Sequence, residues 1–309
     1  MAPYDPSWPS IFEGEAANIK SCLGDNLIAT YHVGSTAAPG LAAKKNIDIL
    51  GIVCNSEEAL RLQMIGYVFK GEFNIPLRYF FSKNTPKSKV NLHIYTDGHP
   101  EIELNLRFRD YLRSYPSARD EYAELKSRLL LDETSLEKNN SPFVNYTLRK
   151  SGFIRNILKL AGFDRLRILK CSDETEWYIA KHFRNKYFFN EMKIDDPYTW
   201  TFHSPDHSHL VLYQGVEIIG YAHIQTWPLN RAALRIIVID ETKRNDGFGS
   251  SFLRFCEDWL RRGGCKSIHV ESSRSALAFY RKNFYIEMPF NDPDFYTSDP
   301  EDIAVGKIL

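Results

Sequence analysis

The feature that most constrains the fold is an apolar strand that leads through a glycine-containing turn into an amphipathic helix. The strand ends at residues 236–239 (IIVI), the turn spans residues 243–249 (KRNDGFG), and we expect the helix from Phe248 to Arg262. Glycines let backbone N–H groups approach an anion, and the positive end of the helix dipole points to the same place. The unit therefore predicts a pyrophosphate-binding turn. Its spacing fits neither a P-loop nor a G-x-G-x-x-G fingerprint.

Length and composition favour two ordinary globular domains. The chain has 309 residues, of which 43% are hydrophobic and 25% charged, and its 39 basic and 39 acidic residues give a formal net charge of zero. A balanced charge argues against general binding to nucleic acid or to a membrane surface, since contacts with phosphates need a basic excess. The five cysteines are scattered, and we find neither a signal peptide nor an apolar run long enough to span a membrane. These features predict a cytoplasmic protein.

We predict a domain boundary after Gly162, which gives domains 1–162 and 163–309. A helix is expected from Phe143 to Leu160, and glycine at Gly162 is a natural helix terminator because it accepts the left-handed conformation. In the first domain we expect helices at 10–23 and 117–131, the latter with Ser117 as its N-cap. We expect strands at 27–33 and 46–53 and, as weaker candidates, at 90–95 and 102–106.

The second domain has the pattern of an α+β layer. Strands are expected at 166–169, 209–213, 217–225, 232–239, 267–271 and 303–309, and helices at 175–183, 248–262 and 275–282. The predicted fold class is thus α+β or α/β, with two domains that each contain a mixed sheet and helices.

Two further motifs in the second half carry a family resemblance. The turn contains Arg244, Gly247 and Gly249 in the spacing Arg-x-x-Gly-x-Gly, and residues 276–284 (ALAFYRKNF) resemble the signature A-x-x-F-Y-x-K-x-G-F. The second half therefore resembles the GNAT superfamily of acyltransferases. The resemblance implies a GNAT fold, acetyl-CoA as cofactor and transfer of the acetyl group to a small-molecule amine.

The resemblance also implies roles for individual residues. Those expected to bind the cofactor are Arg244 and the backbone N–H groups of Asn245, Asp246, Gly247, Phe248 and Gly249 at the pyrophosphate, the backbone of Ile237 and Ile239 at the pantetheine, and Ser273 nearby. Tyr280 would be the general acid that protonates the departing thiolate. The alternative is that Tyr280 is a packed aromatic side chain beside Phe279.

The general base stays open. The strand at 232–239 carries no glutamate, and the candidates are Glu271 on the next strand, His223 on the previous strand, or a water relay. Asn283 replaces the glycine of the family signature, although asparagine tolerates a left-handed conformation.

The aromatic and acidic stretch 183–200 corresponds to the region that shapes the acceptor site. Acids such as Glu191, Asp195 and Asp196 beside aromatic side chains would suit a cationic amine. The alternative is a set of core aromatics with a solvated acidic loop. We expect His203, His207 and His209 to lie in a polar loop, and we expect no metal, because nothing completes a ligand set.

The first half carries a second resemblance. Residues 31–44 (YHVGSTAAPGLAAK), the opening YDPSWP at 4–9, NLHI at 91–94, RFRDYLR at 107–113 and the Tyr146-x-x-x-Lys150-x-x-Phe153-Ile154 pattern occur in order. This half resembles the GrpB family, which implies a nucleotidyltransferase-like fold.

A nucleotidyl transfer needs carboxylates that hold two magnesium ions, typically as Asp-x-Asp/Glu on one strand face. Here Asp48 is followed by Leu50, so one ligand is missing, although Glu101 or Glu103 could supply a carboxylate. The candidate residues of a pocket for a phosphorylated or anionic ligand are His32, Gly34, Ser35, Lys44, Asp48, Arg78 and His93. The alternative is that Asp48 is a buried group that stabilises the Gly34-Ser35 turn.

These patterns leave three hypotheses. The first is an N-acetyltransferase with an accessory GrpB-like domain. The second is a nucleotidyltransferase or nucleotide-binding regulator whose GNAT half only binds ligand. The third is a two-ligand regulatory protein without either chemistry. The sequence does not define the amine or the oligomeric state.

Overall fold

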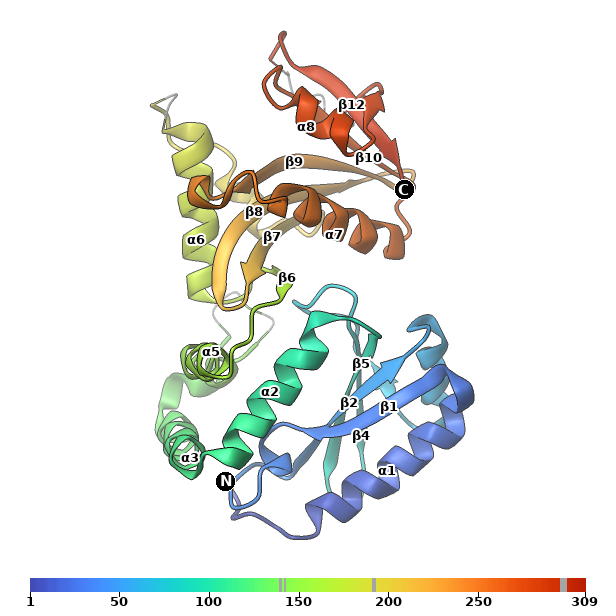
Figure 1. Ribbon diagram of the computed structural model, residues 1–309, viewed down its shortest axis with the longest axis vertical. Helices are drawn as coiled ribbons and strands as arrows, with labels where there is room; N and C mark the ends of the chain where they lie inside the picture. The colour runs from blue at the N-terminus through green and yellow to red at the C-terminus, as the bar shows by residue number, and fades with distance from the viewer. Residues whose placement is uncertain (139–140, 142, 191–192, 295–298) are drawn as a thin grey trace. The chain divides into compact units, whose positions relative to one another are not determined.

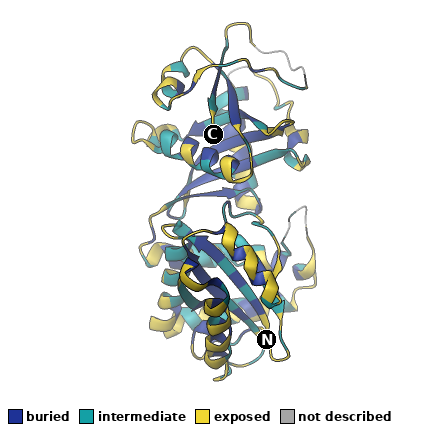
Figure 2. Cartoon of the chain, turned by 90° about the vertical axis from the view of Figure 1, so that its right-hand side faces the viewer, coloured by how far each residue is buried: buried dark blue, intermediate teal, exposed yellow. Residues whose placement is uncertain are grey.

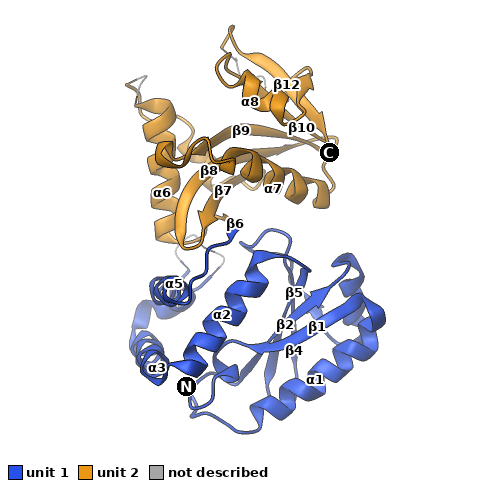
Figure 3. Cartoon of the chain, in the orientation of Figure 1, with its two compact units in different colours: residues 1–167 blue, residues 168–309 orange. Residues whose placement is uncertain are grey.

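The computed structural model describes residues 1–138, 141, 143–190, 193–294 and 299–309, and it divides into two compact units, Met1–Arg167 and Ile168–Leu309 (Figure 3). Gly162 ends helix α5 (Ser151–Leu160) at a φ of 68°. The N–H groups of Gly162 and Phe163 donate to the carbonyls of Lys159 and Leu158, the hydrogen bonds of a left-handed helix terminator. The domain boundary that we place after Gly162 stays a prediction.

In the described part of the first unit, five strands form a mixed sheet in the order β1-β2-β5-β4-β3 (Figure 1). The strands are β1 Leu27–Val33, β2 Asn46–Val53, β3 Val68–Phe69, β4 Tyr79–Asn84 and β5 Lys89–Thr96. Strands β2 and β5 are parallel, with Asp48 opposite Asn91, and the other pairs are antiparallel. The first unit thus has the mixed sheet that the sequence predicts.

Helices cover both faces of this sheet, which buries the alternate side chains of the central strands. Helix α1 (Trp8–Leu23) packs on the face of Ile47 and Ile49. Helix α2 (Pro100–Ser114) packs on the opposite face, where Leu50 and Ile52 are buried. Figure 2 shows the buried strands between helices whose outer sides are exposed. Helices α3 (Pro116–Leu131) and α4 (Asn145–Leu148) complete the unit with α5.

Three local predictions in the first half are wrong. Residues 102–106 alternate in polarity like a strand, but they lie inside α2, which starts at Pro100 with the His99 side chain accepting from Glu101 N. The helix expected at 143–160 is divided into α4 and α5. Helix α3 has Tyr115, not Ser117, as its N-cap, because Pro116 occupies the first helical position.

In the described part of the second unit, seven strands form a sheet in the order β11-β12-β10-β9-β8-β7-β6. They are β6 Leu166–Lys170, β7 His207–Gln214, β8 Glu217–Trp227, β9 Arg231–Ile239, β10 Ser267–Ser272, β11 Ile286–Glu287 and β12 Ile303–Ile308; β6 begins in the last residues of the first unit. Strands β9 and β10 are parallel, whereas the β7–β8, β8–β9, β10–β12 and β11–β12 pairs are antiparallel.

In the residues that the structure describes here, three α-helices accompany this sheet: α6 (Glu174–Arg184), α7 (Phe248–Arg262) and the short α8 (Leu277–Lys282). Helix α6 starts with a capping box between Asp173 and Glu176 and packs against Tyr221. Helix α7 packs against the opposite face at Gly220, where an added Cβ would lie 3.3 Å from Phe252. The bounds of α7 are those predicted from the sequence.

Strands β9 and β10 separate along their length. The pairing joins residues 231–233 of β9 to residues 267–269 of β10, and within the described part of the chain the rest of β9 has no strand partner on that side. A bulge on β9 follows, because His223 of β8 pairs with Ile236 and Ile224 pairs with Leu234, which leaves Arg235 as the extra residue. Among the described strands, residues 236–239 of β9 therefore pair with β8 alone. Among the described residues, no helix is both long and apolar enough to cross a membrane.

Candidate functional site

A cleft of about 500 Å³ lies at the glycine turn after β9, and we call it the turn cleft. Its lining residues are Ile237, Val238, Ile239, Arg244, Asn245, Gly247, Gly249, Ser250, Ala276, Phe279, Tyr280 and Lys282. The structure therefore brings the end of β9, the start of α7 and helix α8 to one cavity, including seven of the residues that the sequence singled out for the cofactor and the acid.

The backbone of the turn has the conformation that an anion site requires. Asn245 and Gly247 have φ values of 72° and 83°, and Gly247 is the N-cap of α7. The first N–H groups of a helix have no partner within it, so they can donate to a ligand. No atom lies within 4 Å of a Cβ built on Gly247, whereas a Cβ on Gly249 would lie 3.2 Å from Phe279. A ligand can therefore approach the backbone at Gly247, whereas Phe279 already packs against the backbone at Gly249.

The Arg244 side chain links the turn to strand β9 by a hydrogen bond. Its Nε donates to the carbonyl of Ile239 at 3.0 Å, and its guanidinium lies 4.9 Å from the ring centre of Tyr187. Tyr187 in turn donates to Asp240 and accepts from Glu241 N. These contacts hold the guanidinium at the rim of the turn cleft.

Tyr280 contributes a buried phenol to the turn cleft. It is 6% exposed, and its ring contacts Phe279 and Tyr285. Burial raises the pKa of Tyr280 well above its ordinary value, so the phenol keeps its proton throughout the neutral and moderately alkaline range.

The remaining cofactor candidates lie beside the cleft rather than in its wall. Asp246 and Phe248 belong to the turn and the first position of α7, where only their backbone is in question. Ser273 is exposed, and its Oγ lies 3.0 Å from Ser275 Oγ in the turn before α8.

A second cavity of about 280 Å³, which we call the histidine cavity, adjoins β9 at Ile236. It is lined by Arg184, Phe188, Phe189, Tyr198, Trp200, Thr201, His207, His223, Arg235, Ile236, Glu271 and Asp302. Both candidate bases, Glu271 and His223, therefore line one cavity. Because Ile236 lines this cavity and Ile237 lines the turn cleft, the two cavities meet β9 at consecutive residues.

Glu271 and Asp302 place two carboxyl groups in the histidine cavity. Glu271 pairs with Ala304 across β10 and β12, and Asp302 lies two residues before Ala304, so both side chains leave the same face of the sheet. Burial raises the pKa of Glu271, with Arg235 opposing the shift and Asp302 adding to it. Burial also raises the pKa of Asp302.

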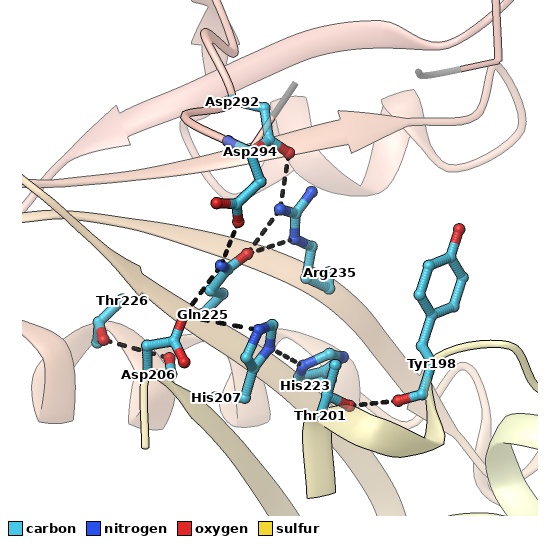
Figure 4. A network of polar contacts seen from close by, with 10 residues as sticks. All are labelled: Tyr198, Thr201, Asp206, His207, His223, Gln225, Thr226, Arg235, Asp292 and Asp294. Atoms are coloured by element: carbon cyan, nitrogen blue, oxygen red, sulfur yellow. Dashed lines mark hydrogen bonds and ion pairs between the residues drawn. The ribbon is translucent and has the colours of Figure 1, made fainter. Parts of the chain in front are cut away.

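His223 has both ring nitrogens engaged. Its Nδ1 lies 3.3 Å from Nη1 of Arg184, which can only donate, so Nδ1 accepts and the proton of the neutral ring is on Nε2. Nε2 of His223 therefore donates to Nδ1 of His207, and the two nitrogens are 2.7 Å apart (Figure 4). Burial, together with His209 and Arg184, lowers the pKa of His223 well below its ordinary value. No lone pair of the neutral ring remains for a substrate.

The expectation of a polar histidine loop is wrong for two of its three members. His207 and His209 lie in β7, and His209 is buried opposite His223. The sequence signal was present, since residues at alternate positions of one strand share a face. His203 ends the short 3-10 turn Thr199–His203.

Arg184, which the sequence did not single out, organises this region. Its side chain is fully buried, donates to Asp196 through Nε at 2.5 Å and Nη2 at 2.8 Å, and donates to Tyr221 at 3.2 Å. Asp196 is therefore committed to Arg184. Asp195 is exposed, and Glu191 lies outside the described residues.

A second chain of contacts fixes Arg235, the bulged residue of β9. Arg235 donates to Gln225 Oε1 at 2.6 Å through Nη2 and pairs with Asp292 at 2.7 Å. The Gln225 amide donates to Asp206 and Asp294 (Figure 4). The wall of the histidine cavity thus carries two carboxyl groups, Glu271 and Asp302, and two guanidinium groups that are each paired with an aspartate outside the wall.

The candidate pocket of the first unit divides into two groups. Asp48 accepts from Asn91 at 2.8 Å, and its Oδ2 would lie 2.4 Å from a Cβ built on Gly34, the residue before Ser35. The Lys44 ammonium lies 4.2 Å from the ring centre of Tyr146. Gly34 has a φ of 72°, so a side chain there would be strained and would overlap Asp48. Burial raises the pKa of Asp48.

Arg78, His93 and His32 do not join that group. Arg78 and His93 lie farther along the same face of the sheet, where Arg78 packs on the rings of Phe73 and Phe80. His32 bonds Thr36 and stacks on Phe12, and burial lowers its pKa to about 4. In the described part of the chain, no group of three or more His, Cys, Asp or Glu side chains could hold a metal ion.

Comparison with known proteins matches the two halves to two families. The family model of GrpB protein covers residues 1–160, and that of the acetyltransferase (GNAT) family covers residues 171–284. A UPF0157 protein of Halalkalibacterium halodurans is 37% identical over 166 residues, which are 52% of this chain and 82% of that protein.

Solved structures give parallel matches. The conserved protein GrpB from Enterococcus faecalis is 36% identical, covering 52% of this chain and 95% of its own, with a TM-score of 0.46. The PaiA N-acetyltransferase from Thermoplasma acidophilum, solved in complex with coenzyme A, is 16% identical, covering 47% of this chain and 99% of its own, with a TM-score of 0.37.

Proposed function

The chain belongs to the GrpB family and carries a GNAT acetyltransferase domain in its second half, and from this premise we propose that it transfers the acetyl group of acetyl-CoA to a small-molecule amine. The observation that carries the proposal is the turn cleft. There the start of α7, the part of β9 beyond its pairing with β10, and the phenol of Tyr280 meet. The first half is an accessory domain in this proposal.

Acetyl-CoA would occupy the turn cleft. Its pyrophosphate would accept from backbone N–H groups of residues 245–249, with Arg244 at the rim, and its pantetheine would pair with the backbone of Ile237 and Ile239. The open space at Gly247 supports this arrangement because a phosphate can approach the backbone there. The close approach of Phe279 to Gly249 also supports it. Because Gly249 has no side chain, α8, which carries Tyr280, packs close to the start of α7.

Glu271 is the better candidate for the general base. A base needs a lone pair directed at the substrate, and both nitrogens of neutral His223 are engaged with Arg184 and His207. The raised pKa of Glu271 makes its carboxylate a stronger proton acceptor than an ordinary glutamate. His223 would then hold Arg184 and His207 in position.

In the reaction, the ammonium releases one proton to solvent and the neutral nitrogen attacks the thioester carbonyl. The nitrogen of the tetrahedral intermediate then gives a second proton to Glu271, directly or through water. The C–S bond of the tetrahedral intermediate then breaks, and the proton of the Tyr280 phenol goes to the thiolate. The raised pKa of Tyr280 keeps that proton available at physiological pH.

The histidine cavity supports a cationic acceptor with an apolar or aromatic body. Glu271 and Asp302 would attract an ammonium group, while Tyr198 and Trp200 would contact the body of the substrate. A negatively charged acceptor would meet these carboxylates without a free cation to offset them, since Arg184 and Arg235 are already paired.

A thiol-release assay with a library of primary amines and acetyl-CoA tests this proposal. We expect turnover with mono- or polycationic amines and none with acidic amino compounds. Absence of free CoA release with every amine, for a folded chain that binds acetyl-CoA, would contradict transfer to an amine.

A further inference from the structure

The first unit contains a group of lysines around the Gly34-Ser35 turn that the proposed acetyl transfer does not use. Lys126 of α3 is 2% exposed, and its ammonium donates to Ser35 Oγ at 3.1 Å and to the carbonyl of Ala42 at 2.7 Å. It therefore reaches from the helix to both sides of the loop that follows β1.

Two more lysines from other segments lie at one tyrosine ring, and Lys150 interacts electrostatically with both Lys126 and Lys44. The Nζ atoms of Lys44 and Lys150 lie 4.2 Å and 4.5 Å from the ring centre of Tyr146. Lys44 belongs to the loop before β2 and Lys150 to the start of α5. Lys150 also acts electrostatically on Asp48. We call Lys44, Lys126 and Lys150 the lysine cluster.

The charges of the lysine cluster are not balanced by carboxylates. Within the described residues, no ion pair joins a carboxylate to any of the three lysines. The nearby carboxyl of Asp48 is already bonded to Asn91, and burial raises its pKa. Burying an ammonium group away from water without a counter-ion costs free energy, so such a group normally has a partner.

The lysines respond to this surplus of positive charge. Burial and neighbouring lysines lower the pKa values of Lys126 and Lys150 to about 8. A pKa near 8 leaves both side chains mostly charged at neutral pH, and a bound anion would restore their ordinary pKa values.

We propose that the lysine cluster and the Ser35 hydroxyl bind the phosphoryl group of a small phosphorylated ligand. Three ammonium groups beside a single carboxyl match the charge of a phosphate dianion better than that of a carboxylate, which carries one charge. The short Gly34-Ser35 turn adds a hydroxyl donor next to Lys126. The site lies within the first unit and does not depend on acetyl transfer by the second.

The residue set of this site differs from that predicted by sequence. Ser35, Lys44, Gly34 and Asp48 stay, with Gly34 and Asp48 shaping the turn, and Lys126 and Lys150 join them. The sequence pattern could have indicated Lys126, because it lies between Tyr122 and Leu129 on the buried face of α3. A lysine in an apolar stripe needs a polar partner or a ligand.

Calorimetric titration of the full chain with inorganic pyrophosphate tests the site. Because the turn cleft is another anion site, the variants assign the binding: Lys150→Met and Lys44→Met should each weaken it about tenfold or more, as loss of a charged hydrogen-bond donor does. Lys159→Met, at an exposed position of α5, removes the same charge and should leave it within about twofold. Lys44 is exposed, so its variant will fold even if Lys150→Met does not.

The pH dependence of ligand affinity distinguishes a binding role of the lysines from a purely structural role. A lysine with a pKa of about 8 is about nine-tenths protonated at pH 7 and about one-tenth at pH 9, so affinity should fall severalfold between them, and binding at pH 8 should take up protons. Titrations with phosphate and ATP distinguish free phosphate from a nucleotide as the source of the phosphoryl group; binding of either one, lost in the lysine variants, supports the site. Unchanged affinity in folded Lys44→Met and Lys150→Met, or no binding to folded wild type, would overturn the proposal.

Discussion

At the scale of single residues, the account depends on the buried phenol of Tyr280 and the half-buried carboxyl of Glu271, and partial or full burial raises the pKa of both. The raised pKa values keep the acid protonated and make the base more basic. The sequence predicted both candidates but not this environment. Because burial raises the pKa of Tyr280, we expect phenol ionisation not to limit activity in the neutral and moderately alkaline range.

Replacing Tyr280 with phenylalanine keeps the ring packing against Phe279 and Tyr285 but removes the proton. We expect Tyr280→Phe to retain acetyl-CoA affinity and to lose about a hundredfold to ten-thousandfold in turnover. Steady-state kinetics with calorimetry measure the two effects, and Tyr178→Phe, at an exposed position of α6, serves as the control. Turnover within a few-fold of wild type, with chemistry rate-limiting, would mean that Tyr280 only packs.

Glu271→Gln should lower kcat about a hundredfold or more and remove the low-pH limb of the rate profile that Glu271 causes. In wild type the base must be deprotonated, so that limb should lie above the ordinary glutamate pKa because the pKa of Glu271 is raised. Glu287→Gln, on an exposed side chain, is the matched control. A Glu271→Gln enzyme with wild-type turnover, together with an inactive folded His223→Gln enzyme, would reverse our preference.

At the scale of elements, the turn between β9 and α7 is the part that sequence predicted best. Its helix has an apolar stripe and a glycine start, both of which are local properties. The wrong strand at 102–106 has a clear cause, since the alternation there is strand-like but Pro100 and His99 start a helix. The histidine cavity was not predictable as a unit, because Arg184, His207 and His223 meet only through the pairing of β7 with β8 and the packing of α6.

Gly247→Glu tests the turn as an element. Its φ of 83° means that any side chain costs about 1–2 kcal/mol of stability, but the open space avoids a steric clash. We expect a folded variant with no measurable acetyl-CoA binding, because the carboxylate repels the pyrophosphate. Gly247→Ala carries the same backbone strain without the charge and should bind more tightly than Gly247→Glu. Equal affinities for the two variants would argue against a pyrophosphate at this position.

On strand β2, Leu50 stands where a nucleotidyltransferase would have a second metal-binding carboxylate. Leu50 occupies the second position of the expected Asp-x-Asp pair, and it is fully buried in a cluster with Val33, Ile52 and Tyr95. We therefore expect no incorporation of labelled nucleotide into any product when the chain is incubated with magnesium and nucleoside triphosphates. Incorporation that disappears in Asp48→Ala would show that the domain transfers nucleotides despite Leu50.

At the scale of the whole molecule, the chain joins a GrpB domain to a GNAT domain, and each has its own candidate anion site. The sequence predicted both families from ordered motifs, and the family models confirm them. The acceptor, which depends on side chains from β8, β9, β10 and the segment before β7, could not be identified from any local motif.

Calorimetric titration of the full chain with acetyl-CoA tests the central claim most directly. The account predicts one site per chain with a dissociation constant in the micromolar range, about −8 kcal/mol of binding free energy, that is lost in folded Gly247→Glu and kept in Tyr280→Phe. Absence of acetyl-CoA and CoA binding by a folded wild-type chain, or binding that folded Gly247→Glu leaves unchanged, would contradict it.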